Sequence, residues 1–185
     1  MKKLSIILVL FCLAVSLAAV TNTWQGDESL SWRTAGNWSL NLVPTATHDV
    51  VIPAGTPNYC YVTQTGGYNA YCNSIVLQNG ATLRVGNAVV QIDYDLTIYG
   101  HLYFSSDDAV VDVNDDIIWG SGSTENITRG EIWVKDDWTF EDGSNCTLGT
   151  GSTVIFDYAT NSSINCSDSN GTFGNLFIDK PAGTG

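Results

Sequence analysis

Two different segments of this chain each recur at intervals of 21 residues, and this shared period limits the fold more than any other feature. The first segment appears as SIVLQ (Ser74–Gln78), DLTIY (Asp95–Tyr99), DIIWG (Asp116–Gly120) and DWTFE (Asp137–Glu141). The second appears as AVVQI (Ala88–Ile92), AVVDV (Ala109–Val113), GEIWV (Gly130–Val134) and GSTVI (Gly151–Ile155). Unrelated segments that repeat in phase indicate stacked repeats, in which each copy buries its apolar face against the next.

Within each copy the apolar residues alternate with polar ones, which is typical of β-strands. Stacking the copies predicts four inward columns of like side chains. These columns are Ile75, Leu96, Ile117 and Trp138; Leu77, Ile98, Trp119 and Phe140; Val90, Val111, Ile132 and Thr153; and Ile92, Val113, Val134 and Ile155. A third, weaker strand is predicted from Ala81 and again from His101.

The fold that this pattern predicts is all-β: a right-handed parallel β-helix with rungs of about 21 residues, stacked at ~4.8 Å. A sandwich of antiparallel hairpins would explain the alternation, but it would not explain a period that two segments share.

Three parts of the chain are expected. Residues 1–19, with two lysines before an apolar run that ends in small residues, have the form of a secretory signal peptide. Residues 20–72 break the period and are rich in aromatic residues, so they are predicted to cap the solenoid. Residues 73–185 are predicted to be β-helix rungs that continue beyond the end of this chain.

The charge of the chain restricts its partners. There are 19 Asp and Glu residues against 7 Lys and Arg, giving a formal net charge of −12. Such a surface repels nucleic acid and anionic membranes. We therefore expect no nucleic-acid partner and no membrane insertion once the signal segment is removed. The signal peptide predicts a secreted or cell-surface protein.

Four cysteines remain after the predicted signal peptide: Cys60, Cys72, Cys146 and Cys166. An even number of cysteines in a secreted chain predicts two disulfides, and three pairings are open. The local pairs Cys60–Cys72 and Cys146–Cys166 are favoured. The second pair is separated by close to one repeat, so its thiols are expected to stack on adjacent turns.

The segment TWQGDESLSWRTAGNWSLNLVPTATHDVVIPAG (Thr23–Gly55) resembles the N-terminal part of large secreted bacterial cell-surface proteins that continue into a β-helix. It is also similar to the eight-glycine extracellular domain, whose rung phrase is matched by DLTIYGHLYF (Asp95–Phe104). The phrase FGNLFIDKPAG, from Phe173, recurs in the bacterial group. The resemblance implies a secreted, non-catalytic region, and neither family supplies a catalytic motif.

Two rows of acidic residues precede the core strands. Asp95, Asp116 and Asp137 occupy one column at rung spacing, and Asp115 and Asp136 lie beside them. Stacked carboxylates repel one another unless water or a cation lies between them. Calcium, which prefers oxygen ligands, is one expectation for these turns, and a solvated acidic row is the other.

A ligand-binding surface is predicted where Asp112, Glu131 and Trp133 face outward on neighbouring strands. A Trp ring beside carboxylates can hold a sugar by stacking and by hydrogen bonds to hydroxyls. Paired carboxylates also occur in glycosidases, and Arg129 and Lys135 are the nearby basic residues that an elimination mechanism would need. No catalytic motif is visible, however, and fold alone does not imply activity.

The sequence therefore predicts a non-catalytic secreted structural or adhesive β-helix module, with an extracellular glycan or a cell-surface protein as its partner. The alternative is a β-helix module that binds or cleaves polysaccharide.

Overall fold

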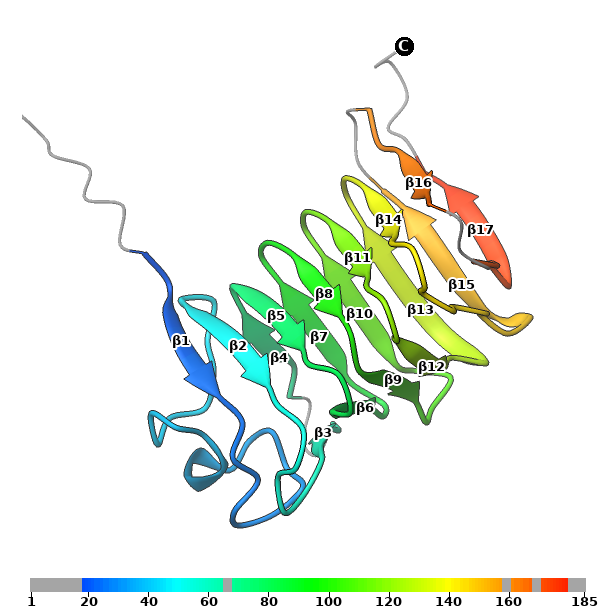
Figure 1. Cartoon of the computed structure of the whole chain (residues 1–185). Helices are drawn as coiled ribbons and strands as arrows, with labels where there is room; N and C mark the ends of the chain where they lie inside the picture. The colour runs from blue at the N-terminus through cyan, green and yellow to red at the C-terminus, as the bar shows by residue number, and fades with distance from the viewer. Residues whose placement is uncertain (1–17, 65–67, 158–160, 168–170, 180–185) are drawn as a thin grey trace, which may run out of the picture.

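The computed structural model describes residues 18–64, 68–157, 161–167 and 171–179. Over these ranges the chain forms a parallel β-helix of about 6 turns, so the predicted fold is confirmed (Figure 1). Residues 1–17 of the predicted signal peptide lie outside the described residues. Among the residues described, no helix is long and apolar enough to cross a membrane.

Three parallel sheets run along the solenoid. Each complete turn contributes one strand to each of the three sheets. The seven-stranded sheet has the order β1 (Val20–Thr23), β2 (His48–Ile52), β5 (Ser74–Leu77), β8 (Leu96–Ile98), β11 (Ile117–Trp119), β14 (Trp138–Phe140) and β16 (Ile164–Cys166).

The six-stranded sheet has the order β4 (Ala70–Cys72), β7 (Val89–Ile92), β10 (Val110–Val113), β13 (Arg129–Val134), β15 (Gly151–Phe156) and β17 (Asn175–Ile178). The four-stranded sheet consists of β3 (Cys60–Val62), β6 (Thr82–Val85), β9 (His101–Phe104) and β12 (Thr124–Asn126). The last of these sheets contains the weaker strands predicted from Ala81 and His101, and Leu83 pairs with Leu102 in it.

The first two inward columns are confirmed. Ile117 is in register with Leu96 on one side and with Trp138 on the other, and Trp119 lies between Ile98 and Phe140. All six side chains are at most 1% exposed. The two columns therefore form one continuous core along the axis. Burying an apolar side chain of this size contributes about 1.5–3 kcal/mol to stability.

The other two columns follow the prediction only as far as β13. There Ile132 pairs with Val154 rather than Thr153, and Val134 pairs with Phe156 rather than Ile155. The interval between β13 and β15 is therefore 22 residues. Side chains alternate between the two faces of a strand, so the extra residue turns Val154 and Phe156 inward and leaves Thr153 and Ile155 outside. The predicted core positions of Thr153 and Ile155 are wrong.

The N-terminal segment closes the solenoid with three tryptophans. The rings of Trp24 and Trp32 each pack edge-on against Trp38, at centroid distances of 5.0 and 4.7 Å. A 3-10 turn, η1 (Ala35–Asn37), positions Asn37, which is buried. Its side-chain oxygen accepts hydrogen bonds from the backbone N–H groups of Glu28 and Ser29, which fixes the loop between β1 and the turn.

The solenoid also reaches into the region predicted as cap. Strands β2, β3 and β4 lie within residues 20–72, and they pair in parallel with β5, β6 and β7. The non-repetitive part of the cap is thus the chain between β1 and β2, which Figure 1 shows as loops beyond the first turn. At the other end, the rung expected from Phe173 is present as β17, which pairs with β15.

Neither predicted disulfide is formed, since all four cysteines are free thiols. Cys60 and Cys72 are buried on two different sheets of the same turn, in β3 and β4. Cys166 does not stack on Cys146: it pairs in register with Phe140 and is exposed, whereas Cys146 is buried. Burial raises the pKa of Cys60, Cys72 and Cys146, so these three thiols stay protonated in the core.

Candidate functional site

The structure brings together the five aspartates that were singled out as cation ligands. They form two groups, Asp95 with Asp115 and Asp116, and Asp116 with Asp136 and Asp137. Within each group the carboxylate oxygens lie within 4.8 Å of one another, and all five side chains are half-buried. This proximity follows directly from rung stacking, because each residue lies one turn above its counterpart.

Hydrogen bonds between turns give the row Asp95, Asp116 and Asp137 a structural role that needs no bound cation. The Asp116 N–H donates to Oδ1 of Asp95 at 3.3 Å, and the Asp137 N–H donates to Oδ1 of Asp116 at 2.9 Å. Asp137 in turn accepts from the backbone N–H of Ser163 at 2.7 Å. Each carboxylate therefore binds an amide of the next turn, at a bend where strand pairing has stopped. We call Asp95, Asp116 and Asp137 the aspartate ladder.

Crowding within these rows changes their ionisation. Burial, followed by the nearby carboxylates, raises the pKa of Asp115. Burial also raises the pKa of Asp116, although the hydrogen bond from Asp137 opposes the shift. Like charges and partial desolvation both disfavour the ionised form, so the rows carry an electrostatic cost at neutral pH.

A second candidate site lies on the outer face of the six-stranded sheet. Strand registers align one outward residue from every turn into a line parallel to the solenoid axis, which we call the axial column. Its members, in order from the cap, are Tyr71, Gln91, Asp112, Trp133, Ile155 and Phe177. Tyr71 and Phe177 are exposed, and the other four are half-buried.

The structure brings together all three residues predicted to bind a ligand. Asp112 and Trp133 are adjacent in the axial column, and Nε1 of Trp133 donates a hydrogen bond to Oε2 of Glu131 at 2.9 Å. This bond fixes the indole ring against the sheet. A cavity of about 480 Å³ borders it, lined by Glu131, Trp133, Thr153, Ile155, Phe177, Ile178 and Asp179.

One edge of this face is acidic. Burial raises the pKa of Asp112, the nearby Lys135 ammonium opposes that shift, and Asp157 and Asp93 add to it. Lys135 donates a hydrogen bond to Asn114, which itself donates to Asp93 at 3.3 Å. We call Asp93, Asp157 and Asp179, at the ends of β7, β15 and β17, the acidic edge.

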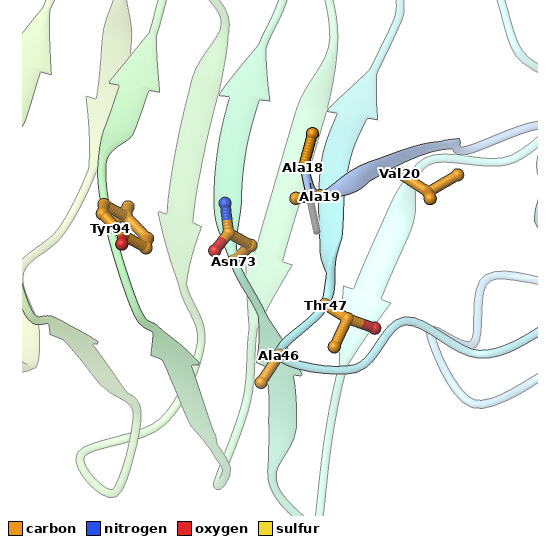
Figure 2. Close-up of a pocket in the computed structure, with 7 residues that line it drawn as sticks. All are labelled: Ala18, Ala19, Val20, Ala46, Thr47, Asn73 and Tyr94. Carbon is orange, nitrogen blue, oxygen red and sulfur yellow. The ribbon is translucent and has the colours of Figure 1, made fainter. Parts of the chain in front are cut away.

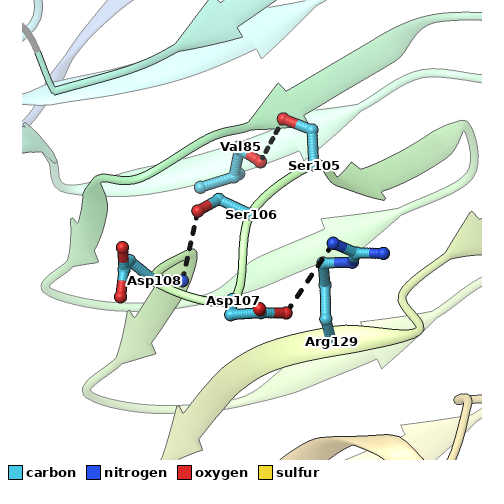
Figure 3. Close-up of polar contacts among 6 residues, drawn as sticks. All are labelled: Val85, Ser105, Ser106, Asp107, Asp108 and Arg129. Carbon is cyan, nitrogen blue, oxygen red and sulfur yellow. Dashed lines mark hydrogen bonds and ion pairs between the residues drawn. The ribbon is translucent and has the colours of Figure 1, made fainter.

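Arg129, the other basic residue considered for elimination chemistry, is engaged elsewhere. Its guanidinium Nη1 lies 3.7 Å from Oδ1 of Asp107, in the loop between β9 and β10 (Figure 3). Arg129 begins β13, four residues before Trp133, which places it roughly 13 Å away along an extended strand. The arrangement therefore directs Arg129 toward Asp107 and away from Trp133, although it lies two residues from Glu131 on the same face of β13.

Two further hollows lie near the cap. One of about 620 Å³ borders the first member of the axial column, Tyr71, and is also lined by Arg33, whose guanidinium carbon lies 4.5 Å from the centre of the Tyr68 ring. Another of about 400 Å³ lies between Ala18, Ala19, Val20, Ala46, Thr47, Asn73 and Tyr94 (Figure 2). Its lining has no charged side chain, and we assign it no chemistry.

Sequence reasoning missed four of the six residues of the axial column. Tyr71 falls within the segment predicted as cap, and Ile155 was predicted to lie in the core. Gln91 and Phe177 were not singled out. The alternation within each strand does identify the outward positions, but the column appears only when the 22-residue interval before β15 is known.

Residues 23–143 match a family of domains of unknown function, DUF8693. The match covers more than half of the chain, which therefore belongs to this family. No curated protein and no solved structure shows a significant match to the chain.

Proposed function

We propose that this DUF8693 member is a secreted structural module that forms a stiff extracellular or cell-surface scaffold and carries out no chemistry of its own. The observation that supports this most is the core: apolar columns continue from turn to turn, and three tryptophans cover one end. Such a solenoid is stabilised by contacts between neighbours and keeps a fixed shape over its length. The proposal also draws on the resemblance of the segment Thr23–Gly55 to large secreted bacterial cell-surface proteins.

Catalytic inertness is tested with the full chain and a panel of neutral, acidic and amino-sugar polysaccharides. We expect no new reducing ends and no unsaturated products, because the two basic residues near these carboxylates, Lys135 and Arg129, are engaged by Asn114 and Asp107. A pectate lyase assayed in parallel shows that the assay detects cleavage. Product release that Asp112→Asn and Glu131→Gln abolish would overturn the proposal.

Secretion is tested by expressing the full chain in a bacterial host. We expect export together with cleavage near Ala18 or Ala19, read by N-terminal sequencing of the exported protein. Leu10→Asp, which interrupts the apolar run, should keep the protein in the cytoplasm. An uncleaved wild-type chain that remains in the cytoplasm would contradict the secreted assignment.

Carbohydrate binding is a second candidate function, favoured by the bond that holds the Trp133 indole beside Glu131 at the edge of a cavity. An aromatic ring next to hydrogen-bond acceptors suits the apolar face and the hydroxyls of a sugar. A glycan array probed with the wild-type chain and with Trp133→Ala tests it. Binding that persists unchanged in the variant would exclude this site.

A further inference from the structure

The last four turns present a continuous surface for an elongated ligand. Asp112, Trp133, Ile155 and Phe177 follow one another in register on β10, β13, β15 and β17. Their spacing along the axis is one rung, ~4.8 Å. Two of the four are aromatic, and the cavity of about 480 Å³ lies over the last three. A ligand that repeats once per rung would meet one side chain of this surface with each unit.

The charge of the same surface is negative, with four carboxylates against two cations. Asp112 and Glu131 lie on the sheet face, and Asp157 and Asp179 lie on the acidic edge beside it. Lys135 is the only cation among the described residues of these four strands and the residues directly after them, apart from Arg129 at the far end of β13. Anionic chains would therefore be repelled, and a ligand with regularly spaced positive charges would be attracted.

We propose that this surface binds an extended β-linked amino-sugar chain with free ammonium groups, laid along the solenoid axis over the four turns. The inference rests on the carbohydrate-binding candidate above and names its ligand class. Pyranose rings would stack on Trp133 and Phe177, and ammonium groups would face Glu131, Asp157 and Asp179. The indole ring also attracts cations through its π face, which favours an ammonium-bearing sugar over a neutral one.

The match in length supports a chain over a single sugar. One sugar of an extended β-1,4-linked chain advances by about one strand spacing, so consecutive rings would fall on consecutive turns. Four turns then accommodate four sugars. A Lys-rich peptide would satisfy the charges, but its repeat per charged residue is shorter than the rung, and it has no flat rings to stack on Trp133.

The test is calorimetric titration of the full chain with glucosamine oligomers of two to six units, and with the fully N-acetylated oligomers as matched neutral ligands. We expect affinity for glucosamine oligomers to rise about tenfold from the dimer to the tetramer and then to level off. The acetylated tetramer should bind about tenfold more weakly. Raising the salt concentration should weaken binding of the charged oligomer only.

Variants locate the contact. Trp133→Ala should weaken binding at every length, whereas Phe177→Ala should weaken the tetramer and leave the dimer unchanged. Glu131→Gln keeps a side-chain oxygen for the Trp133 indole and should reduce the salt dependence. Tyr94→Ala is the control, since this exposed tyrosine lies in the bend after β7.

The outcomes separate the two proposals. Trp133-dependent binding without dependence on length or acetylation would overturn the axial amino-sugar chain and leave the carbohydrate candidate standing. The absence of binding to every oligomer would overturn the amino-sugar chain, and the glycan array would then decide the carbohydrate candidate by itself. Tighter, salt-sensitive binding of a lysine decapeptide at the same residues would overturn the sugar assignment in favour of a cationic peptide.

Discussion

At the scale of single residues, the aspartate ladder shows how one residue can bind two turns. The backbone carbonyl of Asp116 accepts a hydrogen bond from the Leu96 N–H of the turn before, while its carboxylate accepts one from Asp137 of the turn after. Aspartate suits this position because its short side chain reaches a neighbouring backbone amide. The recurrence of Asp95, Asp116 and Asp137 therefore has a structural cause.

Asp116→Ala should destabilise the protein by about 1 kcal/mol, the usual net contribution of one hydrogen bond. Asp116→Asn retains a side-chain oxygen for the Asp137 N–H and removes a charge from a crowded row, so it should be neutral or stabilising. Thermal or urea unfolding of both variants measures the difference. An equal loss in the two variants would show that the charge, rather than the hydrogen bond, matters.

Acidification should stabilise the fold moderately. The pKa values of Asp112, Asp115, Asp116 and Glu125 are all raised, chiefly by burial. The folded state then binds protons more readily than the unfolded one, so stability falls as pH rises from the ordinary carboxyl range near 4. Because these groups are partly exposed, the total is on the order of 1 kcal/mol.

The measurement is the melting temperature at pH 4 and pH 8 in the same salt. The midpoint should be higher at pH 4, and Asp115→Asn should raise the pH 8 value and narrow the gap. A midpoint that is lower at pH 4 would show that carboxylates with lowered pKa values dominate instead.

Removal of divalent cations should leave the melting midpoint unchanged, because backbone amides already bind the carboxylates of the aspartate ladder. The comparison is a melt of the full chain in EDTA against one in millimolar calcium. A midpoint several degrees higher in calcium, lost in Asp136→Asn, would instead assign the two aspartate groups to calcium binding.

At the scale of strands, alternation rather than a fixed count of residues decides which side chains are buried. The turn that leads to β15 is one residue longer than the period, yet Val154 and Phe156 still reach the core. A one-residue shift would bury Thr153 and Ile155 in place of Val154 and Phe156, which puts a hydroxyl in the core and a Phe ring in solvent and costs more than lengthening a loop.

Substitutions on β15 test this register. Val154→Asp should unfold the last turns, because it places an unpaired carboxylate at a fully buried position. Ile155→Asp faces outward and should cost less than about 1 kcal/mol. Circular dichroism and limited proteolysis distinguish the two. The reverse order would mean that the 21-residue interval holds at this strand.

The sequence predicted the core from Ile75 to Phe140 because the 21-residue spacing and the alternation of apolar and polar residues indicate the same inward positions there. It could not predict the register of β15, since periodicity carries no information about a single added residue in a polar turn. The axial face was found in part: Trp133, Glu131 and Asp112 stood out by residue type, whereas Ile155 and Phe177 are unremarkable until strand pairing aligns them. The Cys146–Cys166 pairing failed for a similar reason, because Cys166 is aligned with Phe140.

At the scale of the whole molecule, each turn contacts only its neighbours, so a complete turn should be removable. Deleting residues 96–116 removes β8, β9 and β10 and joins Asp95 to Ile117 in the same register. We expect a folded protein with a cooperative melt and a somewhat lower midpoint.

The matched control deletes residues 97–116, one residue fewer, and so reverses the facing of the strand that follows the junction. This variant should be markedly less stable or aggregate. Far-ultraviolet circular dichroism and size-exclusion chromatography report both results. Equal stability of the two deletions would contradict a structure built from interchangeable turns.

The backbone hydrogen bonds between paired strands run from turn to turn and therefore lie along the axis of the solenoid. A force that pulls its two ends apart acts in line with these bonds, and because the turns are stacked in series, every interface carries the whole force. A tether built in this way would lengthen in steps, releasing one coil after another from an end. The coils still in place would offer a template on which the released ones could fold again when the load falls.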